Sequence, residues 1–74
     1  MKRTVPETTI KPGDTIVVRA LGGRRLKKIA TSGVVSGYDF EVIWACRPEE
    51  WKAAGAEGRQ PEAIPWPATD VSLA

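Results

Sequence analysis

The stretch DFEVIWAC at residues 39–46 decides how the rest of the chain is interpreted. Successive side chains of a β-strand point to opposite faces, so every second residue shares a face. One face of such a strand would carry Phe40, Val42, Trp44 and Cys46, and the other Glu41, Ile43 and Ala45. Because aromatic and β-branched side chains suit a half-buried pleated surface, we predict a central strand with its aromatic face toward the core.

The composition limits the fold to one small domain and limits the chemistry available to it. The chain has 74 residues, so it buries little core. It has one cysteine and no histidine, which excludes an intramolecular disulfide and a zinc site. We therefore expect no metal and no cofactor. The sequence contains no apolar run long enough for a membrane span or a signal peptide, so we expect a cytoplasmic protein without a membrane partner.

Charge is distributed unevenly along the chain. Residues 1–28 contain eight Lys/Arg and two Asp/Glu, for a net charge of +6, whereas residues 29–74 contain three and seven, for −4. A split of this kind indicates a dipolar surface or a polar partner.

The N-terminal part of the chain predicts an arm followed by the first strand. Residues 1–9 have no apolar periodicity, so we expect a flexible N-terminal arm before a small β-barrel domain at residues 10–74. The sequence KPGD at residues 11–14 is typical of a turn. The nearly continuous apolar run that follows predicts a strand at residues 15–20.

A hairpin and a second strand follow. Gly22 and Gly23 are typical of a hairpin turn. Residues 25–31 predict a strand with the lysines of an exposed sheet edge. Residues 34–36 predict either a short strand or a continuation of the same strand past a bulge at Gly33.

The central strand is followed by a helix and three short elements. Pro48 suits the first helical position, acidic residues follow it, and Gly55 predicts the end after about two turns. A helix this short needs an anchor on the domain, and Trp51 is the residue placed to provide it. Beyond the helix, the sequence predicts an extended segment, a single helical turn and a final strand at residues 63–67, 68–70 and 71–73.

This order of elements resembles the Src-homology-3-like small barrels, the group that includes KOW and Tudor modules. It is similar to short uncharacterised bacterial and phage proteins of that fold, over residues 11–73. The residues that match the pattern are Gly13, Asp14, Ile16, Val18, Gly33, Val35, Val42, Trp44, Pro67, Asp70 and Val71. The resemblance implies a mainly all-β barrel of about five short strands, with one short helix before the last strand. Residues 47–64 depart from it, because they are long for a hairpin connection in such a barrel.

The sequence argues against catalysis. Without histidine, the usual general base at neutral pH is missing. Glu49 and Glu50 are adjacent on a helix and face different directions. Cys46, on the face predicted to be buried, acts as a small apolar residue without a base beside it. We therefore predict that the protein is not an enzyme.

A non-catalytic binding module remains, and its most direct candidates are tryptophans. We predict a protein partner that binds through Trp51 and Trp66, because tryptophan is enriched among residues that dominate binding. Trp66, between two prolines, either caps the barrel or lies in an exposed groove. The identity of the partner and the question of self-association stay open.

Nucleic-acid binding is the alternative function. Arginine and lysine side chains cluster on the predicted hairpin, where they could neutralise phosphates. Tyr38 is a candidate for stacking on a base. The candidate residues for this function are Arg19, Arg24, Arg25, Lys27, Lys28 and Tyr38. The same cations are typical of a solvated edge strand without a partner, which is the simpler interpretation.

Overall fold

The computed structural model describes residues 10–37 and 39–74, so the predicted arm at residues 1–9 and Tyr38 lie outside the described residues. The described chain forms six strands, one α-helix and two 3₁₀ turns. The strands are β1 (Thr15–Arg19), β2 (Arg25–Ala30), β3 (Val35–Ser36), β4 (Glu41–Cys46), β5 (Ile64–Pro67) and β6 (Val71–Leu73). The helical elements are η2 (Leu21–Gly23), α1 (Pro48–Glu57) and η3 (Ala68–Asp70).

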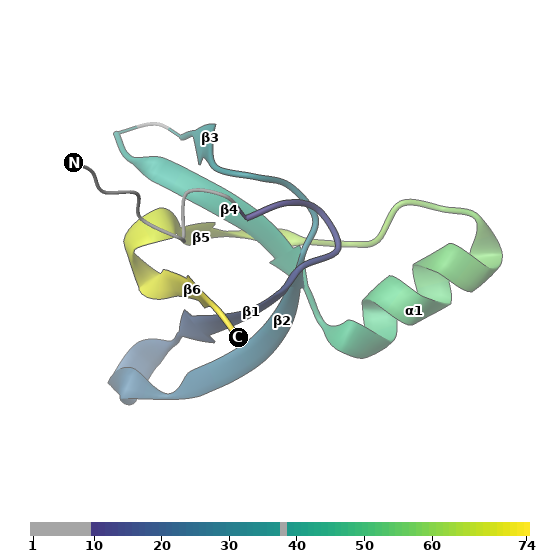
Figure 1. Cartoon of the computed structure of the whole chain (residues 1–74), viewed down its shortest axis with the longest axis horizontal. Coiled ribbons are helices and arrows are strands. Elements are labelled where there is room, and N and C mark those ends of the chain that lie inside the picture. Colours follow the sequence, from purple (N-terminus) through teal and green to yellow (C-terminus); the bar gives the residue numbers. More distant parts are fainter. Residues whose placement is uncertain (1–9, 38) are drawn as a thin grey trace.

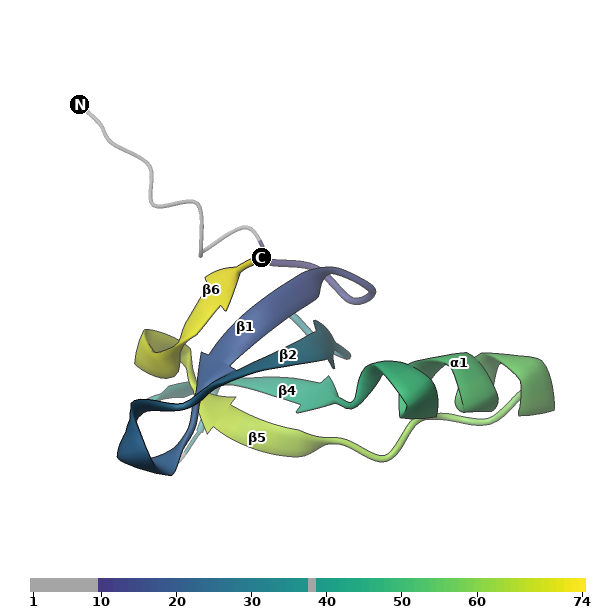
Figure 2. The ribbon, with the colours of Figure 1, turned by 90° about the horizontal axis from the view of Figure 1, so that it is seen from below.

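The strands form one antiparallel sheet that curls into a half-barrel (Figures 1 and 2). The sheet order is β3-β4-β2-β1-β6, and β5 pairs with β4. Val42 pairs with both Val35 and Pro67, so β3 and β5 lie on opposite edges of β4. The short turn η3 then leads from β5 to β6, which pairs with β1. This mainly β architecture confirms the predicted fold class and is compatible with a Src-homology-3-like fold.

The strand β3 continues β2 along the same edge of β4. Ala30 pairs with Ala45, whereas Val35 pairs with Val42, so the register shifts by two residues between the two ladders. The Ser32 hydroxyl accepts a hydrogen bond of 3.2 Å from the Trp44 N–H within this interruption. The described part of the chain therefore has six strand segments where about five strands were predicted, and the helix precedes the last two of them.

The core lies on the face of β4 opposite to the predicted one. Ile43 is 1% exposed and belongs to the hydrophobic core, whereas Trp44 is 40% and Phe40 57% exposed. The prediction that the aromatic face of β4 points toward the core is therefore wrong. The buried core residues are Ile10, Ile16, Val18, Ala30, Ile43, Ala45 and Val71.

Two buried residues on the Trp44 face, Val42 and Cys46, explain why the alternation of β4 does not identify the core face. Val42 lies on the same face as Trp44 and is buried, because the turn after β3 approaches it: a Cβ atom added to Gly37 would lie 3.3 Å from Val42 Cγ1. Cys46 is also buried on that face, which confirms its predicted burial. Both faces of β4 thus contain buried residues, and alternation alone cannot identify the core face.

The strand β2 is an inner strand where it meets β4. It pairs with β1 from Arg25 to Ile29, and Ile29 and Ala30 also pair with β4. The edge-strand prediction is therefore wrong for the end of β2. Its inner face carries Leu26 and Ala30 against the core, and this mixture of apolar and basic residues explains its poor alternation.

The helix α1 is longer than predicted and projects from the half-barrel (Figure 2). It starts at Pro48 as predicted and runs for 10 residues. Gly55 lies within it, because the left-handed residue that ends the helix is Gly58, with φ 68°. Arg59 then donates its backbone N–H to Ala54 O at 3.0 Å, which satisfies a carbonyl at the end of the helix.

Candidate binding surfaces

An exposed aromatic surface lies on the outer side of the half-barrel, and we call it the aromatic face. It consists of Trp44 and the largely covered Val42 on β4, Phe40 in the bend just before β4, and Pro65 and Pro67 on β5. The register places Pro67 opposite Val42 and Pro65 opposite Trp44, and directly paired residues share a face of the sheet. The apolar side chains of two strands thus form one surface.

A groove of about 430 Å³ runs over the aromatic face. Its lining residues are Ser36, Gly37, Phe40, Val42, Trp44, Pro65 and Pro67, none of which is charged. This size and apolar lining lie within the range of pockets that bind ligands. Gly37 is needed at its rim, because a Cβ atom there would come 2.7 Å from the Phe40 carbonyl oxygen.

Trp44 also lines a second hollow of about 590 Å³, which Trp51 lines on the helix side. Trp51 is 37% exposed. Its ring lies beside the turn at Gly13, since a Cβ atom there would be 3.6 Å from Trp51 Cζ2. The exposed rings of Phe40, Trp44 and Trp51 therefore form a strip over two adjoining hollows.

Trp66 lies elsewhere, on the inner face of the half-barrel. It pairs with Ile43, is half-buried and packs against the core. Lys28 Nζ lies 6.0 Å from the centre of its ring, and its Nε1 is buried without a hydrogen-bond partner in the described chain. Of the two predicted positions for Trp66, the structure shows the capping one. It does not bring Trp66 and Trp51 onto one surface.

The predicted basic residues separate into two groups. Arg19 pairs with Arg25 and Val17 with Lys27, so these three cations share the outer face of the β1–β2 hairpin, and all are exposed. Lys28 instead pairs with the core residue Ile16 and points to the inner face, over Trp66. We use the name basic hairpin for the three outer cations, Arg19, Arg25 and Lys27, together with Arg24, which is exposed in the turn between the two strands.

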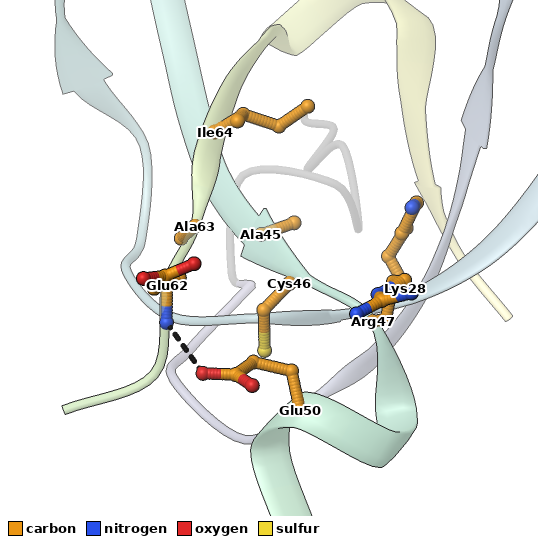
Figure 3. Close-up of a pocket in the computed structure, with 8 residues that line it drawn as sticks. All are labelled: Lys28, Ala45, Cys46, Arg47, Glu50, Glu62, Ala63 and Ile64. Carbon is orange, nitrogen blue, oxygen red and sulfur yellow. Dashed lines mark hydrogen bonds between the residues drawn. The ribbon is translucent and has the colours of Figure 1, made fainter. Parts of the chain in front are cut away.

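A third pocket, of about 490 Å³, lies where β4 meets α1 (Figure 3). Glu50 points into this region, and one of its carboxylate oxygens accepts the backbone N–H of Glu62 at 2.9 Å. The same carboxylate pairs with Arg59, and these hydrogen bonds lower the pKa of Glu50 to about 2. Glu50 thereby ties the segment after α1 back to the first turn of the helix, which is a structural role.

Cys46 lines the same pocket but is a poor nucleophile. Burial raises the pKa of its thiol, and the Glu50 carboxylate raises it further. A thiol that stays protonated at neutral pH lacks the reactive thiolate. The predicted absence of enzymatic activity stays a prediction.

Comparison with models of known families, with curated proteins and with solved structures finds no match. Within residues 10–37 and 39–74, no three cysteine or acidic side chains gather in a way that could hold a metal ion. None of the helices in this part of the chain has the length and apolar character to cross a membrane.

Proposed function

We propose that this protein is a non-catalytic binding module that takes a segment of another protein on its aromatic face. The observation that carries the proposal is the exposure of Phe40 and Trp44, just before and within β4, around a groove without charged residues. Aromatic side chains are enriched in the centres of protein interfaces. Trp51 belongs to this proposal as predicted, and Trp44 takes the place expected for Trp66.

We further infer that the domain belongs to the Src-homology-3-like small barrels and is related to short bacterial and phage proteins of that fold. Support comes from the connectivity of the sheet. β1 pairs with β2, β2 with β4 and β4 with β5; a 3₁₀ turn follows β5, and β6 then pairs with β1. The long helix-bearing connection between β4 and β5 is an elaboration of that pattern.

The exposed rings set the scale of the expected affinity. A fully buried aromatic side chain covers about 150–250 Å². The exposed fractions of Phe40, Trp44 and Trp51 therefore offer roughly 270 Å² together. At about 25 cal/mol per Å², this area contributes roughly 7 kcal/mol before the entropic cost of association, about 4–15 kcal/mol, is subtracted. With a comparable contribution from the partner, the total of roughly 14 kcal/mol leaves a net binding free energy between about zero and 10 kcal/mol, so we expect a reversible complex.

Charge favours a particular kind of partner segment. The groove itself is uncharged, but Asp39 beside Phe40 is exposed, Glu41 is exposed on the Ile43 side of the same strand end, and residues 29–74 carry a net charge of −4. An extended segment with apolar side chains in its middle and Lys or Arg at its ends complements this surface.

Selection from a random peptide library on the intact protein tests the proposal. The selected peptides are synthesised, and their affinities are measured for the wild type, Trp44→Ala and Phe40→Ser. We expect at least a tenfold loss for each variant, since truncating a central aromatic residue at an interface costs about 2 kcal/mol or more. Leu21→Ser is the matched control. It removes an exposed apolar side chain from the turn between β1 and β2, away from the aromatic face, and should bind the peptides normally. Equal binding by all variants would show that the aromatic face is not the site.

A further inference from the structure

The basic hairpin places like charges next to one another without an acidic partner. Arg19 and Arg25 are directly opposite on paired strands, an arrangement that destabilises an isolated sheet. Lys27 follows Arg25 on the same face, and Arg24 lies in the turn. Within residues 10–37 and 39–74, the ion pairs are made by Arg59 alone, so none involves these cations. A cluster of cations without acidic neighbours is complementary to a negatively charged partner.

The tip of the same hairpin carries an exposed leucine. Leu21 is 94% exposed, the largest exposed fraction among the large apolar residues of the described chain. It lies in η2, between Arg19 and Arg24, where it adds nothing to the core. The positive φ angles of Gly22 (76°) and Gly23 (77°) allow the tight turn that presents it.

We propose that the β1–β2 hairpin is a second binding site, which takes duplex DNA. The four cations of the basic hairpin contact backbone phosphates, and Leu21 at the tip enters the minor groove. Proteins that bind the minor groove combine arginine or lysine with an apolar side chain that wedges against the base steps. This site does not depend on the aromatic face, because Phe40 and Trp44 belong to a separate surface.

Two features favour a duplex over other polyanions. Proteins that bind single strands stack bases on aromatic rings, but the hairpin from Thr15 to Ala30 contains no aromatic residue. An anionic membrane would need several apolar side chains on one face, whereas Leu21 is the only large apolar residue at the tip. A narrow groove lined by phosphates matches one leucine surrounded by cations.

Fluorescence anisotropy with a labelled duplex at several salt concentrations measures the number of phosphate contacts. Each contact on duplex DNA contributes about −0.9 to the slope of log affinity against log salt, so four contacts give about −3.6. The wild type should then lose roughly 150-fold in affinity between 50 and 200 mM salt. Arg24→Gln combined with Lys27→Gln should halve the slope and reduce this loss to about twelvefold.

Two control variants separate the site from general electrostatics. Lys11→Gln combined with Lys52→Gln removes the same charge from exposed positions elsewhere and should leave the slope unchanged. Leu21→Ser should weaken binding about tenfold at every salt concentration without changing the slope, because it removes an apolar contact and no charge. Phe40→Ser should bind DNA normally.

Four results would overturn the proposal or a part of it. The first is no duplex binding at low salt. The second is an equal effect of the two double variants, which would indicate attraction of the whole chain. The third is binding to vesicles of phosphatidylserine and phosphatidylcholine without binding to DNA, which would assign the hairpin to a membrane surface. Unchanged affinity of Leu21→Ser would contradict the minor-groove contact.

Discussion

Ile43 and Trp44 are neighbours on β4, and we expect truncation of the smaller side chain, Ile43, to destabilise the domain more than truncation of Trp44. Ile43→Ala removes three carbon atoms from a side chain that is 1% exposed. Their transfer contributes about 2.4 kcal/mol, and the cavity left in a packed core raises the cost within the usual range of about 2–5 kcal/mol. Trp44→Ala removes a larger side chain, but one that is 40% exposed and outside the core cluster. We expect it to cost only about 1–2 kcal/mol, between the values typical of surface and buried sites.

Thermal and urea unfolding followed by circular dichroism measures this order. A domain of this length is stable by about 4–11 kcal/mol, so Ile43→Ala should remove a large part of that stability. At about 4–8 °C per kcal/mol, its melting temperature should fall by about 10–40 °C, against about 5–15 °C for Trp44→Ala. If Trp44→Ala is the more damaging substitution, the assignment of the two faces of β4 is wrong, and with it the exposed aromatic face.

Three further predictions concern local structure. Gly37→Ala should destabilise the domain by about 1–3 kcal/mol, because its Cβ atom would meet the Phe40 carbonyl oxygen; an unchanged melting temperature would contradict this packing. Gly55→Ala, in the interior of α1 with open space around it, should raise stability by about 0.5–1 kcal/mol, and a loss would mean that the helix ends before it. The pKa of Glu50 is lowered to about 2 from 4.5, so its contribution to stability is complete above the unfolded pKa and disappears as the pH falls toward 2. Glu50→Gln should therefore have a lower melting temperature than the wild type at pH 7. Melting curves at pH 7, 4 and 2 should show this difference in melting temperature shrinking as the pH falls. A difference that stays constant would contradict the pair of Glu50 with Arg59.

The order and type of the elements could be predicted from local signals. Glycines and prolines occur where the chain turns. The strand β1 (Thr15–Arg19), the hairpin at Gly22 and the 3₁₀ turn at residues 68–70 confirm those predictions, although β1 ends one residue earlier than predicted. The start of the helix at Pro48 was also predictable. Its end was not, because Gly55 and Gly58 are equally good local stop signals, and only the left-handed conformation at Gly58 identifies the second.

The orientation of the central strand could not be predicted, because it depends on contacts between distant segments. The turn at Gly37 covers Val42, and the aliphatic side chains of β1 fill the core against Ile43. Glu41 lies on the Ile43 face, but at the first residue of the strand, where it is exposed, so its charge does not mark that whole face as solvated. The two prolines beside Trp66 are typical of an edge strand, and β5 places them beside Val42 and Trp44, but an edge position does not indicate which face of β4 is buried.

The basic hairpin shows the same division between local and distant information. Its existence and its charge follow from the sequence around Gly22. That Lys28 leaves the cluster and lies over Trp66 depends on the pairing of β2 with β1 and on the return of β5. The exposure of Leu21 likewise became clear only from the three-dimensional arrangement of the tip.

Nuclear magnetic resonance of the three tryptophan indoles tests the proposed function most directly. Trp44, Trp51 and Trp66 each give one indole N–H signal, and these signals can be assigned by single substitutions to phenylalanine. The ¹⁵N-labelled protein is titrated with a peptide selected on the wild type. We predict that the indole signals of Trp44 and Trp51 both shift progressively as the peptide concentration rises. The signal of Trp66, whose Nε1 is buried on the inner face, should stay in place. A shift confined to Trp66 would contradict the account, because it would place the peptide on the inner face of the half-barrel.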